Sequence, residues 1–393
     1  MKNVQATVVK HTGSHYLLSI LPAWELFPAV IRGKVRLQKS TATNPVAVGD
    51  NVLCEVPDDV SESNPAIITE VLPRRNYVIR KSTNLSREAH IIASNIDRAF
   101  VVVTLAFPEV KLPFLDRLLV TCEVYGVPVT IVLNKIDLLR KAGADDLIAA
   151  FHDTYGRLAG YDIIETSAKT GEGIDTLRQA LAGSAIGSSA SARQTKLFFE
   201  AEPTGLSPAA RAESIKMLSV DPLATREKKN FGLRAQAPRG ADCPAIGVLT
   251  PCGCVDEAPG INLLSGVSGV GKSSIIKALD PSLNPKTAQI SLSHLQGRHT
   301  TTFYEMYPLQ SGGFIIDTPG IRSFGLLDLQ PEEIALYFPE MLRESQNCRF
   351  TPCTHTHEPG CAVKKAVDEG RISADRYNSY LGMLEENTKY RQK

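Results

Sequence analysis

The order of two short motifs constrains the fold of this chain more than any other feature. The segment VLNKIDLL occupies residues 132–139, and the glycine-rich segment GVSGVGKSS comes much later, at residues 266–274. Each directly follows an apolar run, as strand ends do in an α/β sheet. In proteins that contain both motifs, the glycine-rich one usually comes first. The reversed order therefore predicts that the usual chain has been cut in the middle and its old ends joined, which a sheet tolerates when the termini lie close together.

The glycine-rich segment fits G-x-x-x-x-G-K-[ST], follows the apolar INLL and opens a run of helical periodicity. In this context the glycines let backbone N–H groups turn inward and cradle phosphate at a helix N-terminus. Lys272 is expected to reach the β- and γ-phosphates of a nucleoside triphosphate, and Ser273 to ligate Mg²⁺. A plain glycine-rich turn is the alternative. The candidate phosphate-binding residues are Gly266, Val267, Ser268, Gly269, Val270, Gly271, Lys272, Ser273 and Ser274.

The earlier motif predicts a preference for one base. The Asp137 carboxylate can accept two hydrogen bonds, from N1–H and the exocyclic amine of guanine, and adenine offers no such pair of donors. Asn134 is expected to brace the loop beside the base, while the stem of Lys135 covers one face of the ring. The next strand end, ETSAKTG, supplies a backbone N–H for guanine O6. Its candidate residues are Ser167, Ala168 and Lys169.

Two further segments are expected to respond to the γ-phosphate. Asp317 and Gly320 in DTPG follow the apolar run GGFII. Asp317 is the candidate second Mg²⁺ anchor, through water, and the Gly320 N–H the candidate γ-phosphate sensor. Between them and the phosphate loop lies GRHTTTFYEMY, in which Thr301 or Thr302 is expected to close on Mg²⁺. A solvated strand edge is the alternative for these threonines.

The residue after DTPG bears on mechanism. Many GTPases carry at that position a glutamine that orients the attacking water, and this chain has Ile321. Since an aliphatic side chain cannot orient water, His299 is the candidate catalytic residue, because an imidazole can hold water or accept its proton near neutral pH. An ordinary loop histidine is the alternative. Intrinsic turnover is expected to be slow until a partner fixes this segment.

A cysteine- and histidine-rich segment near the C-terminus predicts a metal site. CRFTPCTHTHEPGC places Cys348, Cys353, His355 and Cys361 in the spacing C-x₄-C-x-H-x₅-C. Three thiolates and an imidazole suit tetrahedral Zn²⁺, and four protein ligands close a structural site. We therefore expect one structural zinc ion with no catalytic role. His357 is an alternative ligand, and redox or coincidental cysteines are the alternative to a metal.

The other cysteines carry weaker signals. Cys54 and Cys122 fall in strand and helix patterns and are expected in the core. Cys243, Cys252 and Cys254 lie in an irregular stretch, where either a second metal site or unpaired thiols would fit.

Composition narrows the class of protein. At 393 residues the chain is expected to form two or three domains. A net charge of +1 excludes a global field that attracts nucleic acid or membranes, so such binding would need local patches. No apolar run approaches the ~20 residues that span a bilayer, and the polar N-terminus does not resemble a signal peptide. We expect a cytoplasmic protein, a monomer without membrane contact.

Residues 1–82 alternate apolar and polar positions between turn residues, which predicts a small β-barrel of the oligonucleotide-binding (OB) type. Basic residues gather in this part of the chain. They mark either a solvated barrel surface or a side that faces a polyanion. The residues are Arg32, Lys34, Arg36, Arg74, Arg75, Arg80 and Lys81.

From about residue 97 apolar runs alternate with helical patterns, which predicts a doubly wound α/β sheet. The segment at about 184–260 interrupts this alternation, starts with a Gly/Ser-rich stretch and has no firm periodicity. Helical patterns resume at 330–346 and 372–390. The predicted fold is multidomain α/β: an OB-type barrel (1–82), a circularly permuted P-loop GTPase domain (90–328) and a C-terminal helical zinc-binding domain (329–393).

With these motifs located, the chain resembles the ribosome small subunit-dependent GTPase A family, circularly permuted GTPases with an N-terminal OB fold and a C-terminal zinc domain. The resemblance covers about four-fifths of the chain, and the stretch at 184–260 is longer than the family's usual link. It rests on RGKVR, VGD, VLPRRN, NKID, TSAKTGEG, SGVGKSS, GRHTTT, DTPGIRSFGL, the Cys/His segment and DRYNSYLGML.

The resemblance implies late maturation of the small ribosomal subunit, with GTP hydrolysis stimulated by that subunit and used for release. It also implies a catalytic role for His299 and rRNA contacts from the barrel and the zinc domain. Two rival functions are a GTP-gated RNA-binding checkpoint whose hydrolysis is incidental, and a GTPase that acts on tRNA or another RNA.

Overall fold

The structure is a computed structural model. It describes residues 2–13, 15–36, 45–81, 89–183, 260–283, 304–317 and 329–391, without the side chains of 32–36, 80–81, 89 and 387–391. Several predictions fall outside the described residues: the segment at about 184–260 with Cys243, Cys252 and Cys254, and the basic side chains of Arg32, Lys34, Arg36, Arg80 and Lys81.

The N-terminal unit is a closed five-stranded barrel, which confirms the OB-type prediction. Its strands follow the order β1-β2-β3-β5-β4, and β4 pairs back onto β1 to close the barrel. Only β3 and β5 run parallel. Alternate side chains point inward and form a separate core around Val8, Leu18 and Ile68. The strands are β1 (Lys2–Thr12), β2 (His15–Ile20), β3 (Glu25–Arg36), β4 (Asn51–Val56) and β5 (Ala66–Val71).

A two-stranded hairpin joins the barrel to the next unit. It consists of β6 (Tyr77–Lys81) and β7 (Ala89–Ser94) and forms its own small sheet. Its residues Ile79 and Ile91 pack on Ala47 of the barrel side.

The central unit is a six-stranded sheet in the order β10-β9-β8-β11-β13-β12. The first five strands run parallel, and β12 pairs antiparallel with β13 at the edge. The half that carries NKID comes first in the chain and lies beside the half that carries the glycine-rich loop, which confirms the circular permutation. The strands are β8 (Arg98–Val103), β9 (Val129–Asn134), β10 (Asp162–Thr166), β11 (Ile261–Ser265), β12 (Glu305–Pro308) and β13 (Phe314–Asp317).

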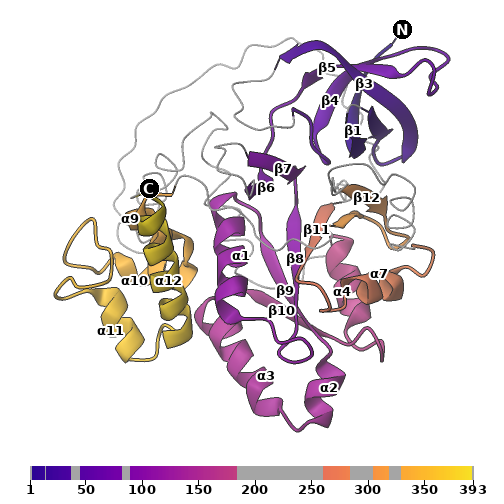
Figure 1. Ribbon diagram of the computed structural model, residues 1–393. Coiled ribbons are helices and arrows are strands. Elements are labelled where there is room, and N and C mark those ends of the chain that lie inside the picture. The colour runs from indigo at the N-terminus through magenta and orange to yellow at the C-terminus, as the bar shows by residue number, and fades with distance from the viewer. Residues whose placement is uncertain are drawn as a thin grey trace, which may run out of the picture.

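Helices cover both faces of this sheet, with α1 and α3 on one side and α4 and α7 on the other (Figure 1). Because both faces are covered, strands such as β9 are buried along their whole length and need a continuous apolar run. The helices are α1 (Leu112–Val124), α2 (Ile136–Lys141), α3 (Asp145–Phe151), α4 (Ile174–Leu181) and α7 (Lys272–Leu279), and a π-helix η1 (His152–Leu158) extends α3. Cys122 in α1 and Cys54 in the barrel are buried, as predicted.

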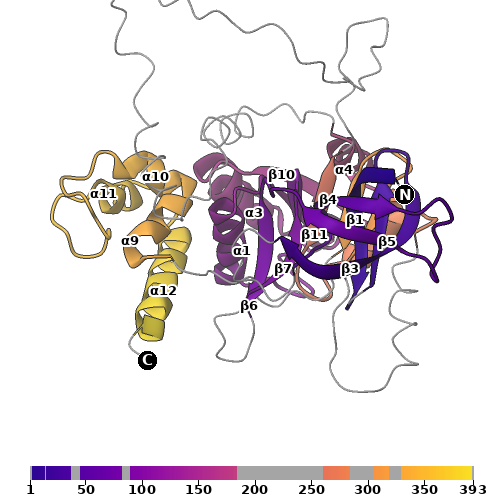
Figure 2. The same cartoon turned by 90° about the horizontal axis from the view of Figure 1, so that it is seen from above.

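The C-terminal unit is helical and packs beside α1, on the side of the sheet away from the barrel (Figures 1 and 2). The helix predicted over 330–346 is broken, because Pro339 disfavours helical geometry at Phe338, which is extended. The elements are α9 (Pro331–Ile334), the 3₁₀ turn η2 (Ala335–Tyr337), α10 (Pro339–Ser345), α11 (Ala362–Asp368) and α12 (Ala374–Arg391). Even α12, the longest helix among the described residues, is too polar to cross a membrane, and no other helix described there could do so.

A buried arginine holds the C-terminal unit against the central one. Arg376 of α12 donates from Nε and Nη2 to the two carboxylate oxygens of Glu340, at 2.7 and 3.0 Å. Its Nη1 donates to Asp116 of α1 at 2.8 Å, and the Tyr155 hydroxyl donates to the same Asp116 oxygen at 2.9 Å. The guanidinium also lies 4.8 Å from the ring centroid of Phe338. Because every charge here is buried, each depends on its partners.

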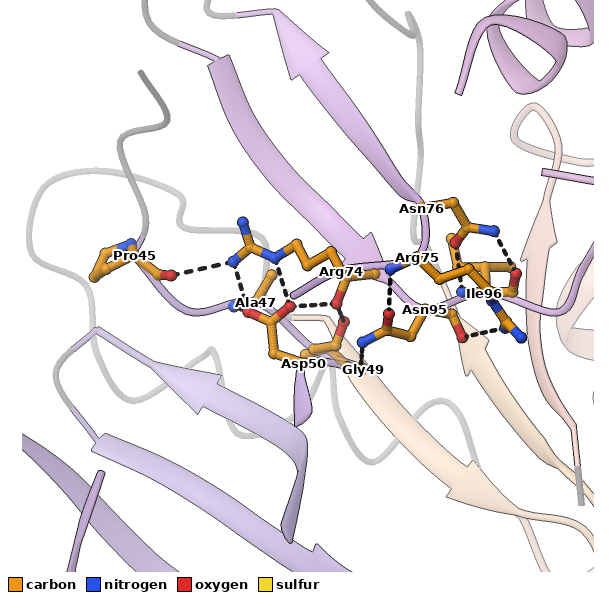
Figure 3. Close-up of polar contacts among 11 residues, drawn as sticks. Pro45, Ala47, Gly49, Asp50, Arg74, Arg75, Asn76, Asn95 and Ile96 are labelled. Carbon is orange, nitrogen blue, oxygen red and sulfur yellow. Dashed lines mark hydrogen bonds and ion pairs between the residues drawn. The ribbon is translucent and has the colours of Figure 1, made fainter. Parts of the chain in front are cut away.

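A second polar network joins the barrel to the segment that leads into the central sheet (Figure 3). The Asp50 carboxylate, fully buried, accepts two hydrogen bonds from Arg74, both at 2.6 Å, and one from the Ser94 hydroxyl at 2.5 Å. Asn95, which directly precedes the central sheet, donates from Nδ2 to the Gly49 carbonyl at 2.9 Å. Gly49 has a φ of +90°, and a Cβ there would lie 2.1 Å from the Ser94 carbonyl oxygen. The motifs VGD and LPRRN therefore build this joint.

This network changes the interpretation of two basic residues. Arg74 pairs with Asp50 and has little exposed side chain, and Arg75 forms an ion pair with Asp97. Both belong to the joint between barrel and sheet. Arg74 is therefore structural, whereas the Arg75 side chain stays 44% exposed beside Asp97.

We predict that Arg376→Ala destabilises the protein by about 3–5 kcal/mol, because it leaves the Glu340 and Asp116 carboxylates buried without a cation. Urea unfolding followed by circular dichroism measures the change. The control is Arg157→Ala, which removes an exposed ion pair with Asp153 and should leave the unfolding midpoint unchanged. Equal midpoints for the two variants would contradict the role of Arg376 in holding the C-terminal unit against the central one.

Candidate functional site

Asn134, the last residue of β9, connects the loops that were predicted to meet. Its Nδ2 donates to the carbonyl of Val270 at 2.7 Å, across 136 positions of sequence. Its Oδ1 accepts from the Thr166 hydroxyl at 3.2 Å and from the Ala168 backbone N–H at 3.3 Å. The side chain is 1% exposed. The NKID, SAK and glycine-rich segments therefore form one site at the carboxyl ends of the parallel strands, where α/β sheets bind ligands.

Lys135 adopts a left-handed backbone with a φ of 63°. Its Nζ donates to the Gly269 carbonyl at 2.8 Å and also to the carbonyl of Phe107. The aliphatic stem of Lys135 thus spans the space between base loop and phosphate loop, consistent with the expected cover over one ring face. Sequence reasoning missed Phe107, because a backbone carbonyl leaves no trace in residue type.

Asp137 has one carboxylate oxygen satisfied and one available. Its Oδ1 accepts from the Ser167 hydroxyl at 2.7 Å, and Ser167 Oγ in turn accepts from the Thr170 N–H at 3.2 Å. The Oδ2 is buried and has no hydrogen-bond partner among the described residues. Such an atom is costly unless a ligand supplies a donor. Guanine N1–H and the exocyclic amine are donors of the required kind, so the residues present fit a guanine base.

The glycine-rich loop has the backbone that phosphate binding requires. Gly271 has a φ of +100°, and a Cβ there would lie 2.4 Å from Asn134 Nδ2, so only glycine fits. The loop leads directly into α7, which starts at Lys272. Several predicted side chains at this edge are exposed: Ser268, Ser273, Ser274 and Lys169.

The Lys272 side chain folds back onto the glycine-rich loop that precedes it. Its Nζ donates to the carbonyls of Gly266 at 2.5 Å and Val267 at 3.1 Å. Burial lowers the pKa of Lys272, and the carboxylate of Asp317 partly opposes that effect. A bound polyphosphate would act in the same direction as Asp317 and favour the charged lysine.

Asp317 ends β13 and pairs in register with Leu264 of β11, next to the glycine-rich loop. The structure therefore brings this predicted Mg²⁺ anchor to the same edge as Lys272. The other predicted residues of this region, His299, Thr301, Thr302 and Gly320, lie outside the described residues.

The four predicted metal ligands converge at the second candidate site. The ligand atoms of Cys348, Cys353, His355 and Cys361 all lie within 4.8 Å of one another and could hold a metal ion. His355 Nδ1 is 3.3 Å from Cys361 Sγ and 3.6 Å from Cys348 Sγ. The alternative ligand His357 is exposed, and its Nδ1 lies 2.9 Å from the hydroxyl of Thr356. The ligand set thus favours His355 over His357.

Surrounding groups hold the ligand loop in place. The Tyr377 hydroxyl of α12 donates to the His355 carbonyl at 2.6 Å. Glu358 accepts backbone hydrogen bonds from Thr354 at 2.7 Å and Thr356 at 2.9 Å. Burial alone would raise the pKa of Glu358, but a hydrogen bond from the Thr354 hydroxyl at 2.6 Å, together with the backbone bonds, outweighs it and lowers the pKa to about 2. The loop is therefore fixed by α12 and by its own carboxylate, as ligands of a structural metal usually are.

The permuted strand order and the guanine and phosphate loops at one sheet edge define a circularly permuted GTPase. The family model described as RsgA GTPase matches residues 71–189 and 257–327. The small ribosomal subunit biogenesis GTPase RsgA of Bacteroides fragilis is 38% identical over 393 residues, covering 99% of each chain. This chain belongs to the RsgA GTPase family.

Other relatives agree over the same length. RsgA of Christiangramia forsetii is 34% identical, covering 99% of this chain and 98% of its own. The crystal structure of YjeQ from Thermotoga maritima has a TM-score of 0.63 at 26% identity, covering 98% of each chain. YloQ, a circularly permuted GTPase, has a TM-score of 0.60 at 23% identity, covering 99% of this chain and 96% of its own, and supports the fold alone.

We predict that Asp137→Asn lowers the affinity for GTP by about 100-fold and raises that for xanthosine triphosphate, since an amide offers the donor that the C2 carbonyl of xanthine needs. Fluorescent nucleotide displacement measures both constants. The matched control is Asp146→Asn, an exposed residue of α3. Unchanged GTP affinity in Asp137→Asn would contradict the base-binding role.

We predict that the purified protein carries one zinc ion and that His355→Ala lowers its affinity by more than about 100-fold, beyond the 10- to 100-fold typical of lost supporting groups. Elemental analysis after dialysis against a chelator measures zinc retention. His357→Ala is the matched control and should retain the metal. Loss of zinc in the control alone would reverse the ligand assignment.

Proposed function

We propose that this protein is a Mg²⁺-dependent GTPase that binds the small ribosomal subunit, assists its late maturation and hydrolyses GTP when that subunit stimulates it. The observation that carries the guanine preference is the Oδ2 of buried Asp137, which has no hydrogen-bond partner among the described residues and lies on the loop that contacts the glycine-rich loop through Asn134. The link to the small subunit comes from the relatives, which are named small ribosomal subunit biogenesis GTPases.

In this proposal separate groups of residues bind the guanine base and the phosphates of GTP. Asp137, with Asn134 and Lys135, holds guanine. The glycine-rich loop and Lys272 hold the phosphates, and lysine charge offsets the negative charge that develops as the γ-phosphoryl group passes from GDP to water. The Ser273 hydroxyl would ligate Mg²⁺ directly, and the Asp317 carboxylate would hold it through water; both offer the oxygen atoms that Mg²⁺ prefers. When bound, Mg²⁺ would neutralise charge on the β- and γ-phosphates.

The catalytic step is assigned to His299, with Thr301 or Thr302 and Gly320 as γ-phosphate contacts. Ile321 leaves the usual glutamine position without a group that can orient water, which supports the histidine assignment. The Cys/His cluster is proposed to hold one structural zinc ion, because four protein ligands would fill the coordination shell that Zn²⁺ prefers and leave no position for substrate. The barrel and the zinc-binding unit are proposed to contact rRNA. The cytoplasmic location and the monomeric state of the protein remain predictions.

We predict that purified small subunits raise GTP turnover by a factor on the order of 10³, the scale of GTPases completed by a partner, while large subunits do not. Phosphate release is measured at two stated salt concentrations, because binding to rRNA depends on salt. Equal stimulation by both subunits would contradict the proposal.

His299→Ala separates hydrolysis from binding. In the proposed mechanism this variant binds the small subunit with GTP but neither turns over nor supports maturation. Normal maturation without hydrolysis would instead favour a GTP-gated RNA-binding checkpoint, and recovery of another bound RNA, such as tRNA, would favour a different substrate.

A further inference from the structure

Two short strands, β12 and β13, border both segments expected to respond to the γ-phosphate. β12 starts at Glu305, three positions after Thr302, and β13 ends at Asp317, three positions before Gly320. The two strands pair with each other along their whole length. Whatever holds this pair therefore also holds the chain ends from which both segments leave.

The barrel contacts β12 directly. Lys10 of β1 pairs in register with Glu305, so that barrel and central sheet form one continuous 11-stranded sheet. Lys10 Nζ also lies 3.0 Å from Glu305 Oε2, and the Tyr307 hydroxyl donates to that oxygen at 3.0 Å.

The barrel contacts β13 through Trp24, in the turn between β2 and β3. Its indole stacks on the ring of Phe314, the first residue of β13, with centroids 5.2 Å apart and planes 20° from parallel. Trp24 adopts a left-handed backbone with a φ of 56°, a conformation disfavoured for a bulky residue. Leu21 of the same turn also packs on the central core. The barrel thus presents an aromatic side chain, carried on a disfavoured backbone conformation, to the strand that carries Asp317.

The other attachment of the barrel reaches a different part of the sheet. Asp50 accepts a hydrogen bond from Ser94 and the Gly49 carbonyl accepts one from Asn95, so this attachment holds the segment just before β8, which carries none of the predicted γ-phosphate contacts (Figure 3). The barrel is therefore anchored to one half of the permuted domain while Trp24 touches the other.

We propose that Trp24 is a positioning residue for GTP hydrolysis, which sets β13, and with it Asp317, through Phe314, and whose surroundings change with the nucleotide bound. The inference rests on the proposed GTPase function. Densely packed side chains transmit small displacements, so a shift of β13 between the GDP and GTP states should reach the indole. Trp24 is partly buried, which makes its emission sensitive to such a shift.

The first test uses the fact that Trp24 is the only tryptophan of the chain. Intrinsic emission is recorded at saturating GDP and at saturating non-hydrolysable GTP analogue, with saturation checked by an independent binding measurement. We expect different emission in the two states and loss of that difference in Phe314→Leu. Identical emission in both saturated states would overturn the inference while leaving the GTPase function intact; absence of guanine nucleotide binding would overturn both.

The second test separates positioning from folding. Trp24→Ala is expected to lower subunit-stimulated kcat by about three- to tenfold, the scale of one lost aromatic pair, with the KM for GTP within about twofold. Trp24→Phe should restore most of the rate, and Leu26→Ala, an exposed residue two positions away, should match the parent protein. Unchanged kcat in Trp24→Ala, or a loss that Trp24→Phe does not rescue, would overturn the positioning role.

Discussion

The hydrogen bonds of the Asn134 side chain are the constraint on which the site depends. A permuted chain must bring together base and phosphate loops that are far apart in sequence, and the one amide does so by donating to Val270 and accepting from Thr166 and Ala168. An amide is suited to this task because it offers both donors and acceptors. The close approach also requires glycine at position 271, so the two motifs constrain each other.

Both flanking units are attached with the help of an ion pair between an arginine and a buried carboxylate. Arg376 joins the C-terminal helices to α1, and Arg74 holds Asp50 in the joint that anchors the barrel. Buried ion pairs contribute little net stability, but each is expensive to break singly. They therefore suit joints that must keep one geometry, in this case two accessory units on either side of a nucleotide site.

Much of the fold and site was predictable because it depends on local patterns. The glycine-rich loop, NKID and the Cys/His spacing each encode their chemistry within a few residues, and their order predicted the permutation. The pairing of Arg376 with Asp116 was not predictable, since it links residues 260 positions apart. The role of Arg74 was ambiguous for a related reason. Its residue type does not show whether the guanidinium faces solvent or pairs with Asp50. The break at Phe338 was visible in Pro339, but helical periodicity masked it.

The pairing of β12 with β1 also reduces the tendency of the central sheet to associate with other chains. Within the described residues, β12 would otherwise be the outer strand of the central sheet, and an uncovered strand edge can pair with another chain. The barrel covers this edge at Glu305, and Pro308 ends the strand after four residues with no N–H to offer. The barrel thus serves as a cap against strand-to-strand association, so a central unit cut free of it would carry a new surface for aggregation.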